Sequence, residues 1–463
     1  MSEVEIKVLS LHRNSTDRMP DTIIIRKGLD LPIGGAAEKY VTDRRDITTY
    51  AVKPTDFVGL TPKMMVAEGD VVKVGDALFC DKNDERIRFT SPVSGVVKAV
   101  VRGEKRRILE VVVESDGKSE ASEHFEVSEN SEDLKKTMLR CGLWTMMRQR
   151  PFGIVANPDD EPKAIFVSAF SSAPLAPDYD FIMQGREEYL KKGLEALTKL
   201  TKGKVNVSFR RETRDTGHET WDIGQLQTHF VKGPHPAGNI GTQINHIDPI
   251  NKGDIVWTMN LQDVAVLGEL VSTGVYNPDK VIAVAGPNVE KPQYYKLKAG
   301  ACLKDIKVKE HSRVISGDVL SGTQIAPDGF VGAYDDLVSV IPEGDYYDFM
   351  GWLMPGVKKY SFSRTFLSGF LPKLLTWKFD TNTHGDVRPL VFTGNFERVF
   401  PFDIYPTQLI KACIIGDIEL MENLGIYEVE PEDFALCEFV DVSKTDIQAI
   451  IRNALESLRK ENA

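Results

Sequence analysis

The segment HPAGNIGTQINHIDP, residues 235–249, concentrates groups that bind metal ions. His235 and His246 could supply imidazole nitrogens and Asp248 a carboxylate, which is the donor set of a metal-dependent hydrolase. The histidines are eleven residues apart, and no helical or strand period fixes their directions. His246 and Asp248 alternate, so they share a face if the chain is extended. Two ligands do not make a site, so the metal-dependent hydrolase is an alternative and not the leading hypothesis.

The same segment contains the glycines of a possible phosphate loop. Gly238 and Gly241 would allow a phosphate to approach the backbone, but the pattern shows neither a strand before them nor a clear helix start after them. Pro234, Pro236 and Pro249 restrict the backbone around the segment. We therefore expect a fixed, extended loop that borders an α/β layer and has a structural or interface role.

Lys82 is a second residue that could carry chemistry. The stretches 68–79 and 89–101 alternate valines with polar residues around glycine turns, and this paired pattern resembles biotinyl and lipoyl domains. Lipoyl domains carry their cofactor on a lysine at a hairpin tip, so a lipoyl-type carrier using Lys82 is another alternative. The pair Asp81-Lys82 comes early in the hairpin, and two acidic residues follow at once. We expect an unmodified, structural barrel-sandwich hybrid.

Composition excludes several classes of protein. A formal net charge of -11 argues against general nucleic-acid binding, which needs a basic surface. The N-terminus lacks the apolar core of a signal peptide, and no window has the uncharged length of a membrane span. No two cysteines have the C-x-x-C spacing of a zinc ribbon or a bacterial ferredoxin, and a reduced, cytosolic environment suits them; they are Cys80, Cys141, Cys302, Cys413 and Cys437.

The elements that would position these groups form a multidomain chain. Residues 163–209 read as strand, helix and strand, which predicts a parallel crossover and a Rossmann-like layer. Residues 254–274 add a strand and a helix that Gly274 ends, and residues 134–149 read as a helix entering this domain. Residues 406–426 and 444–460 have the period of amphipathic helices, so we expect a helical C-terminal domain.

Four blocks together resemble one family. They are IRKGLDLPIGG (25–35), RFTSPVSGVVKAVVRGEKRRILEVVVE (88–114), CGLWTMMRQRPFG (141–153) and HPAGNIGTQINHIDP (235–249). The family they resemble is NqrA, which supplies one subunit of the sodium-translocating NADH:quinone oxidoreductase of bacteria. The resemblance implies a six-subunit complex that oxidises NADH, reduces quinone to quinol and pumps Na⁺ out of the cell. It further implies a peripheral subunit on the cytoplasmic side of the inner membrane, with membrane subunits as partners and quinone as substrate.

The resemblance and the elements together give a fold class of mixed α+β and α/β, with six segments. We expect an N-terminal extension (1–20), a barrel-sandwich hybrid (21–115) and an acidic linker (116–133). A Rossmann-like α/β domain (134–279), a β-grasp-like, SLBB-type domain (280–350) and a helical C-terminal domain (351–463) follow. The isolated chain is not expected to be catalytic, because nothing in it can pass an electron without a prosthetic group.

The redox relatives that the resemblance implies carry a flavin loop and iron–sulfur cysteines. Here the loop position holds Trp144 and several other bulky residues, whereas a flavin phosphate needs close approach to the backbone. The cluster position keeps only Cys437, with Asp441 where a second sulfur could stand. We therefore expect neither FMN nor an iron–sulfur cluster on this chain, and no covalently bound cofactor.

The quinone role that the resemblance implies points to the loop 144–152. A quinone site needs an apolar slot and donors for two carbonyl oxygens. The loop offers Trp144, Met146, Met147 and Phe152 as the slot, and Arg148 and Arg150 as the donors. The alternative is that Trp144 and Phe152 are core residues and the arginines are solvated.

The basic, aromatic segment 358–379 is the candidate for docking on a membrane subunit. Aromatic side chains alternate with lysines and one arginine there, as expected for a segment at headgroup level or against a membrane partner. The alternative is an internal apolar segment with polar edges. The candidate residues are Phe362, Arg364, Phe366, Phe370 and Trp377.

Overall fold

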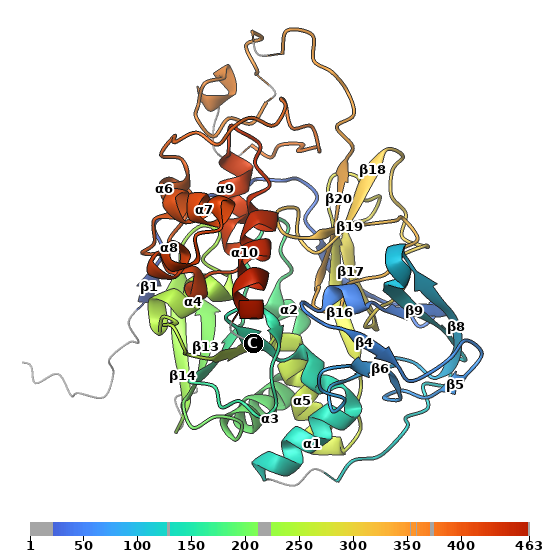
Figure 1. The fold of residues 1–463 in the computed structure, drawn as a ribbon. Helices are drawn as coiled ribbons and strands as arrows, with labels where there is room; N and C mark the ends of the chain where they lie inside the picture. The colour runs from blue at the N-terminus through green and yellow to red at the C-terminus, as the bar shows by residue number, and fades with distance from the viewer. Residues whose placement is uncertain are drawn as a thin grey trace, which may run out of the picture.

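The computed structural model describes residues 22–126, 130–211, 224–351, 353–357, 359–370 and 375–461. Three β-rich units, a helical C-terminal unit and one long irregular segment make up this part of the chain (Figure 1). The expected N-terminal extension lies outside the described residues. Among the residues described, no helix has the length and apolarity needed to cross a membrane.

A seven-stranded sheet forms the α/β unit. Its first five strands are parallel to one another, and each of the last two pairs antiparallel with the strand before it. This confirms the parallel crossover predicted from residues 163–209. The strands, in spatial order, are β1 (Thr22–Ile24), β14 (Leu226–Lys232), β13 (Lys204–Arg210), β12 (Ala164–Ser168), β15 (Val256–Thr258), β10 (Arg148–Arg150) and β11 (Ile154–Val155).

Helices cover both faces of this sheet. Alternate residues of β12 point to opposite faces: Ile165 packs in the cluster that includes helices α3 (Glu187–Thr198) and α5 (Leu261–Thr273). Phe166 packs on the other face with helix α4 (Ile240–Ile247). Helix α5 ends where Gly274 takes a left-handed conformation, as predicted.

The prediction of an extended loop for residues 235–249 is wrong for the second half of this segment. Helix α4 occupies that half and follows β14 closely, with Asn239 at its N-cap. Ile240, Ile244 and Ile247 are four and three residues apart, so they face the sheet together. Eight residues contain only two helical turns, and the polar residues between these isoleucines hid the period.

The helix predicted for residues 134–149 is shorter than expected. Helix α1 (Ser131–Cys141) ends at Gly142, which adopts φ +84°. A side chain at Gly142 would also meet Thr90 Oγ1 at 2.3 Å, so glycine is required there on two counts. The chain then makes a short 3-10 turn, η3 (Leu143–Met146), before entering β10.

The barrel-sandwich unit pairs a four-stranded and a three-stranded sheet. Stacked Phe79 and Phe89, with ring centroids 4.8 Å apart, lie in the core of this unit. The first sheet has the order β3 (Thr49–Val52), β9 (Ile108–Ser115), β8 (Gly95–Arg102), β5 (Val71–Val72). The second has the order β4 (Pro62–Met64), β6 (Ala77–Asp81), β7 (Arg88–Thr90).

The remaining sheet and the C-terminal helices complete the body. The six-stranded sheet has the order β19 (Thr323–Ile325), β18 (Ser312–Ser316), β20 (Leu337–Pro342), β16 (Asp279–Ala285), β17 (Gln293–Lys298), β2 (Glu38–Asp43). The helices, which build a separate core, are α6 (Phe396–Val399), α7 (Pro406–Ile415), α8 (Ile418–Asn423), α9 (Ala435–Val440) and α10 (Ile447–Glu461).

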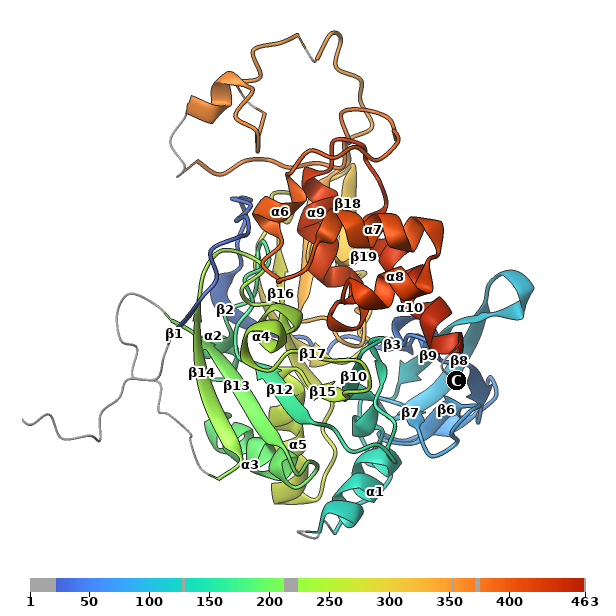
Figure 2. The same ribbon diagram turned by 60° about the vertical axis from the view of Figure 1, so that its left-hand side comes forward.

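Residues 344–392, which we call the apolar extension, leave the body and return to it (Figure 2). Their described part contains no strand and a single 3-10 turn, η4 (Leu367–Phe370). Large apolar side chains are nevertheless exposed along it, including Tyr347, Phe349 at 90% and Phe370 at 86%. A monomeric soluble protein rarely exposes so many apolar groups together, so this segment is a candidate contact surface.

Candidate functional site

The candidate site is a cavity at the carboxyl ends of β12 and β15. In the sheet, β13 lies on one side of β12, and β15, which comes later in the sequence, lies on its other side. The strand order therefore reverses between β12 and β15. Open α/β sheets bind their ligands at such a reversal. The cavity there has a volume of about 180 Å³. We call it the switch-point cavity; its lining includes Arg148, Ser168, His235, Asn239, Asn260 and Glu432.

Two helices begin at this cavity. Asn239 and Asn260 are the N-cap residues of α4 and α5, and neither side chain caps its helix. Backbone N–H groups in a first helical turn have no partner within the helix, and the helix dipole adds positive potential there. These N–H groups favour an acceptor oxygen in the cavity, whereas the carboxylates of Asp318 and Glu432, which also line it, oppose a full negative charge.

His235 contributes a side-chain donor to the cavity. It is only 3% exposed, and its backbone N–H donates to Asp30 Oδ1 at 2.9 Å. Ser172 Oγ accepts from the Gly238 N–H at 2.7 Å and keeps a proton that it can donate to His235 Nδ1 at 3.2 Å. In the tautomer that accepts this hydrogen bond, the imidazole proton is on Nε2, for which no hydrogen bond to a described residue is found.

Burial lowers the pKa of His235 from its ordinary value, although the nearby carboxylates Asp318, Asp30 and Glu432 oppose this shift. The imidazole is therefore neutral at pH 7, and Nε2–H acts as a neutral donor in the cavity.

Arg148 contributes the positive charge that lines the cavity. Its backbone belongs to β10, which pairs with β15 through Thr258. Its guanidinium lies 5.1 Å from the ring centroid of Tyr334, and this cation–π contact fixes its direction. Because β10 continues directly from the η3 turn, the bulky loop that the sequence singled out delivers one arginine to the cavity.

The structure separates the other predicted quinone residues from this cavity. Trp144 and Met147 are both fully buried, and Trp144 donates through Nε1 to the Ala156 carbonyl at 2.8 Å. Its ring also meets Trp257 edge to face at 5.3 Å. Phe152 packs edge to face on Tyr427. Trp144 and Phe152 serve the core, as the alternative interpretation proposed, and so does Met147, so these residues do not form the predicted slot in this structure.

Arg150 is also not available as a quinone donor. Its side chain is 2% exposed and lies between Glu430, Glu432 and Asp433, at 3.3, 2.6 and 3.1 Å. Burial raises the pKa of Asp433 to about 7, against the opposing effect of Arg150. The cluster joins β10 to the C-terminal helical unit, so Arg150 holds two units together.

The three residues of the metal-hydrolase alternative do not converge. Asp248 pairs with Lys163 at 2.7 Å, and His246 Nδ1 contacts the Thr242 carbonyl of its own helix at 2.8 Å. His235 instead faces the switch-point cavity. In the part of the chain that the structure describes, no group of three or more His, Cys, Asp or Glu side chains could hold a metal ion. This alternative is therefore wrong for the residues proposed.

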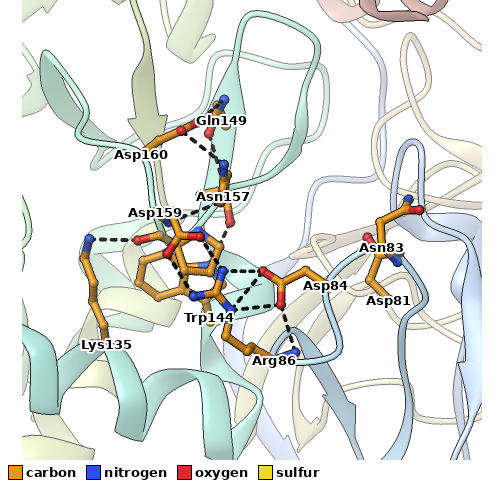
Figure 3. A network of polar contacts seen from close by, with 12 residues as sticks. Asp81, Asn83, Asp84, Arg86, Lys135, Trp144, Gln149, Asn157, Asp159 and Asp160 are labelled. Carbon is orange, nitrogen blue, oxygen red and sulfur yellow. Dashed lines mark hydrogen bonds and ion pairs between the residues drawn. The ribbon is translucent and has the colours of Figure 1, made fainter. Parts of the chain in front are cut away.

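The hairpin that carries Lys82 is anchored to the α/β unit. Arg86, in the same hairpin, binds Asp84 within it and Asp159 across the interface, at 2.7 and 2.6 Å (Figure 3). The Lys82 backbone N–H donates to the Thr61 carbonyl at 2.8 Å. The Lys82 side chain is exposed, but a hairpin tied at both ends favours a structural module over a swinging arm.

The predicted docking residues divide into two groups. Phe362 lies under the guanidinium of Arg398 at 4.5 Å, and Trp377 donates its backbone N–H to the Pro32 carbonyl at 2.8 Å. Phe366 is half-buried. Arg364 and Phe370 are exposed on the apolar extension. The exposed part of this segment is thus smaller than predicted, but it continues toward Phe349, which sequence reasoning left out.

Sequence reasoning also missed the cavity roles of His235 and Asn260. It treated His235 only as a possible metal ligand. The signal for Asn260 was present, because an asparagine shortly after a buried strand and directly before a helix marks a helix start at the ligand-binding edge of an α/β sheet.

Three family models match consecutive parts of the chain. They are described as the NqrA N-terminal barrel-sandwich hybrid domain (residues 23–116), the NqrA second alpha/beta domain (129–276) and the NQRA C-terminal domain (281–326). One chain of the NAD⁺-reducing [NiFe]-hydrogenase, in the air-oxidised crystal structure, is similar over 73% of this chain and 62% of its own, with 12% identity and a TM-score of 0.35, which is too low to indicate a shared fold.

Curated relatives match almost the whole chain. Proteins from Yersinia pseudotuberculosis and Pasteurella multocida, each named as the A component of the Na(+)-translocating NADH-quinone reductase, are 39% identical over 449 residues. The protein of that name from Neisseria meningitidis is 40% identical over 450 residues. Each alignment covers 95% of this chain and 100% of the relative. The chain therefore belongs to the NqrA family, whose members are subunits of the Na(+)-translocating NADH-quinone reductase, an oxidoreductase complex.

Proposed function

We propose that this subunit binds the headgroup of quinone in the switch-point cavity. The observation that carries the proposal is the pairing of two donors in one cavity: the free Nε2–H of His235 and the guanidinium of Arg148. Sites for drug-sized ligands measure roughly 300–1,000 Å³, so a cavity of about 180 Å³ suits a single substituted ring and not a dinucleotide. A quinone ring presents two carbonyl oxygens, one for each donor.

The same groups suit the reduced form of the ligand. Negative charge develops on the oxygens as quinone accepts electrons, and fixed donors in a secluded site stabilise that charge. Arg148 supplies a full positive charge, and the uncapped starts of α4 and α5 supply oriented N–H groups. The electrons come from redox groups on other subunits, so in our proposal the isolated chain binds quinone without reducing it.

The chain would work inside a larger assembly. We propose a six-subunit complex in which this chain lies on the cytoplasmic side of the bacterial inner membrane and contacts membrane subunits. The apolar extension supports this, because Phe349 and Phe370 need a partner surface to leave water. We also propose the domain limits 21–115, 134–279, 280–350 and 351–463, joined by the linker 116–133. Two of the strands within 21–115, β1 and β2, pair with the other sheets.

The quinone proposal is tested with the purified full chain and a short-chain ubiquinone analogue, by titration calorimetry. We expect Arg148→Gln to weaken affinity about tenfold or more, since a hydrogen bond from a charged group contributes roughly 1.5–3 kcal/mol. His235→Gln should weaken it about two- to tenfold, since a hydrogen bond between neutral groups contributes roughly 0.5–1.5 kcal/mol. Arg140→Gln is the matched control, because Arg140 is exposed on α1 and pairs with the surface residue Glu123 at 2.8 Å.

Unchanged affinity in both cavity variants, with melting temperatures equal to the wild type, would exclude this cavity as the quinone site. Absence of binding by the wild-type chain would show that the isolated protein does not bind quinone at all.

A further inference from the structure

The hairpin between β8 and β9 ends in a basic tip. Residues 102–107, RGEKRR, contain four cationic side chains and one carboxylate, in a chain whose net charge is -11. We call Arg102, Lys105, Arg106 and Arg107 the basic tip. The hairpin projects from the body at the right of Figure 2, and none of its residues lines the switch-point cavity. Its charge is therefore presented to the surroundings and not to the proposed quinone site.

The four cations form no ion pair within the described part of the protein, and Glu104 is the one carboxylate in the tip itself. All four side chains are exposed, and no ion pair joins any of them to a carboxylate among the described residues. The contact they make is internal to the tip, from Arg102 Nη1 to the Arg106 carbonyl at 3.3 Å. Lys98, lower on the same strand, does pair with Glu114 at 3.4 Å. The tip thus concentrates positive charge that the fold leaves unneutralised.

The turn itself disfavours these residue types. Lys105 and Arg106 both have left-handed backbone conformations, with φ of 52° and 62°, and the Arg107 N–H closes the turn on the Glu104 carbonyl at 3.0 Å. Two central residues with positive φ define a type I′ turn, for which Asn-Gly is the favoured sequence. Long side chains with a Cβ are strained there. Backbone strain at Lys105 and Arg106 costs stability, so the two positive charges at these positions point to a function.

We propose that the basic tip binds the anionic lipid headgroups of the membrane beside which the complex lies. Several flexible cations on a projecting hairpin match a diffuse layer of phosphates and need no pocket. Val101 is exposed next to the tip and can enter the headgroup layer with it. The acidic body is repelled by the same surface, so attraction at the tip also orients the chain on the membrane.

This proposal is tested by flotation of the purified full chain with vesicles of phosphatidylcholine alone and with added phosphatidylglycerol. We expect binding to the anionic vesicles only, falling as salt rises. The double variant Lys105→Asn, Arg106→Gly removes two charges and installs the favoured turn sequence, so it should fold at least as well. It should weaken vesicle binding roughly 25-fold, from about fivefold for each cation near the surface.

Two controls separate charge from other effects. Lys105→Arg with Arg106→Lys keeps both charges and should bind like the wild type. Lys191→Gln with Lys192→Gln removes two exposed cations of α3, far from the tip in sequence, and should also bind like the wild type.

Three results would overturn the proposal. They are equal binding to both vesicle types, binding that the tip variant leaves unchanged, and no vesicle binding by the wild-type chain. Crosslinks from Lys105 to carboxylates of a partner protein in the intact complex, together with absent vesicle binding, would assign the tip to that protein instead.

Discussion

The guanidinium of Arg150 is buried and faces three carboxylates, of which Glu430 and Asp433 are buried and Glu432 is partly exposed. One positive charge cannot balance Glu430, Glu432 and Asp433 together, which explains why the pKa of Asp433 is raised to about 7 by burial even beside an arginine. Buried ion pairs contribute little net stability when complete, but removing one partner leaves uncompensated charge. We therefore expect the loss of Arg150 to lower the stability of the folded chain and not primarily to weaken ligand binding.

We predict that Arg150→Met destabilises the chain by about 3–5 kcal/mol near pH 8. Without the arginine, the pKa of Asp433 rises further above its unfolded value, so the folded state gains stability when this carboxyl is protonated. The loss should therefore shrink as pH falls from about 8 to about 5.5. Melting temperatures across this range check both statements. Arg140→Met, at an exposed pair, should cost less than about 1 kcal/mol, and an equal loss in both variants would contradict the prediction.

Helices α3 and α5 cross at two glycines, which lets their backbones touch. A Cβ at Gly268 would lie 1.7 Å from the Tyr189 carbonyl oxygen, and one at Gly193 would lie 2.0 Å from that of Val264. Both obstacles are backbone atoms, which cannot move aside as a side chain can. Helix α5 starts at the switch-point cavity. The short distance between α3 and α5 therefore also determines the position of Asn260 and of the N–H groups in the first turn of α5.

We expect Gly268→Ala to destabilise the chain by about 3 kcal/mol or more, because the helices must separate to admit the methyl group. Thermal unfolding of the full chain measures this. Glu195→Ala, on the exposed face of α3, is the control and should change stability by less than about 0.5 kcal/mol. If Gly268→Ala melts like the control, the close crossing is not a constraint on the fold.

Strand pairing and ion pairs connect the units of the described chain to one another. Strand β1 completes the α/β sheet beside β14, and β2 completes the six-stranded sheet beside β17, although both precede the barrel-sandwich strands in sequence. Arg86 and Arg150 add ion pairs between units. On this interlocked body, the apolar extension exposes large apolar side chains such as Phe349 and Phe370, which suits a surface that meets another protein of the complex.

We predict that Phe349→Ser with Phe370→Ser prevents assembly with the membrane subunits but leaves the isolated chain's melting temperature unchanged. Both rings are almost fully exposed in the free chain, so they stabilise it little and have most to gain from burial by a partner. Co-purification of the complex measures assembly. Ile415→Ser, at a side chain 75% exposed on α7, is the control, and normal assembly of the double variant would exclude docking through these rings.

The sequence by itself determined the family, the order of the units and most of the regular elements. The strand, helix and strand of residues 163–209 and the helix ended by Gly274 could be read locally, because hydrophobic period and glycine caps act within a few residues. The same local rules failed for α4, where two helical turns are too few to display a period. They placed the end of α1 too late, because the left-handed Gly142 is imposed by contact with Thr90.

Only the tertiary structure decided which candidate residues share a site. The loop 144–152 offered six plausible quinone contacts, but chain direction through β10 sends Arg148 to the cavity and Arg150 to a carboxylate cluster. His235 lies far from Arg148 in sequence and joins it because it follows β14 at the carboxyl edge of the parallel strands, where the amino end of the antiparallel β10 pairs with the carboxyl end of β15. The sequence specifies the chemistry that each residue can offer. Contacts between segments that are distant in sequence decide which groups are buried, paired or free, and these contacts exist only in the folded chain.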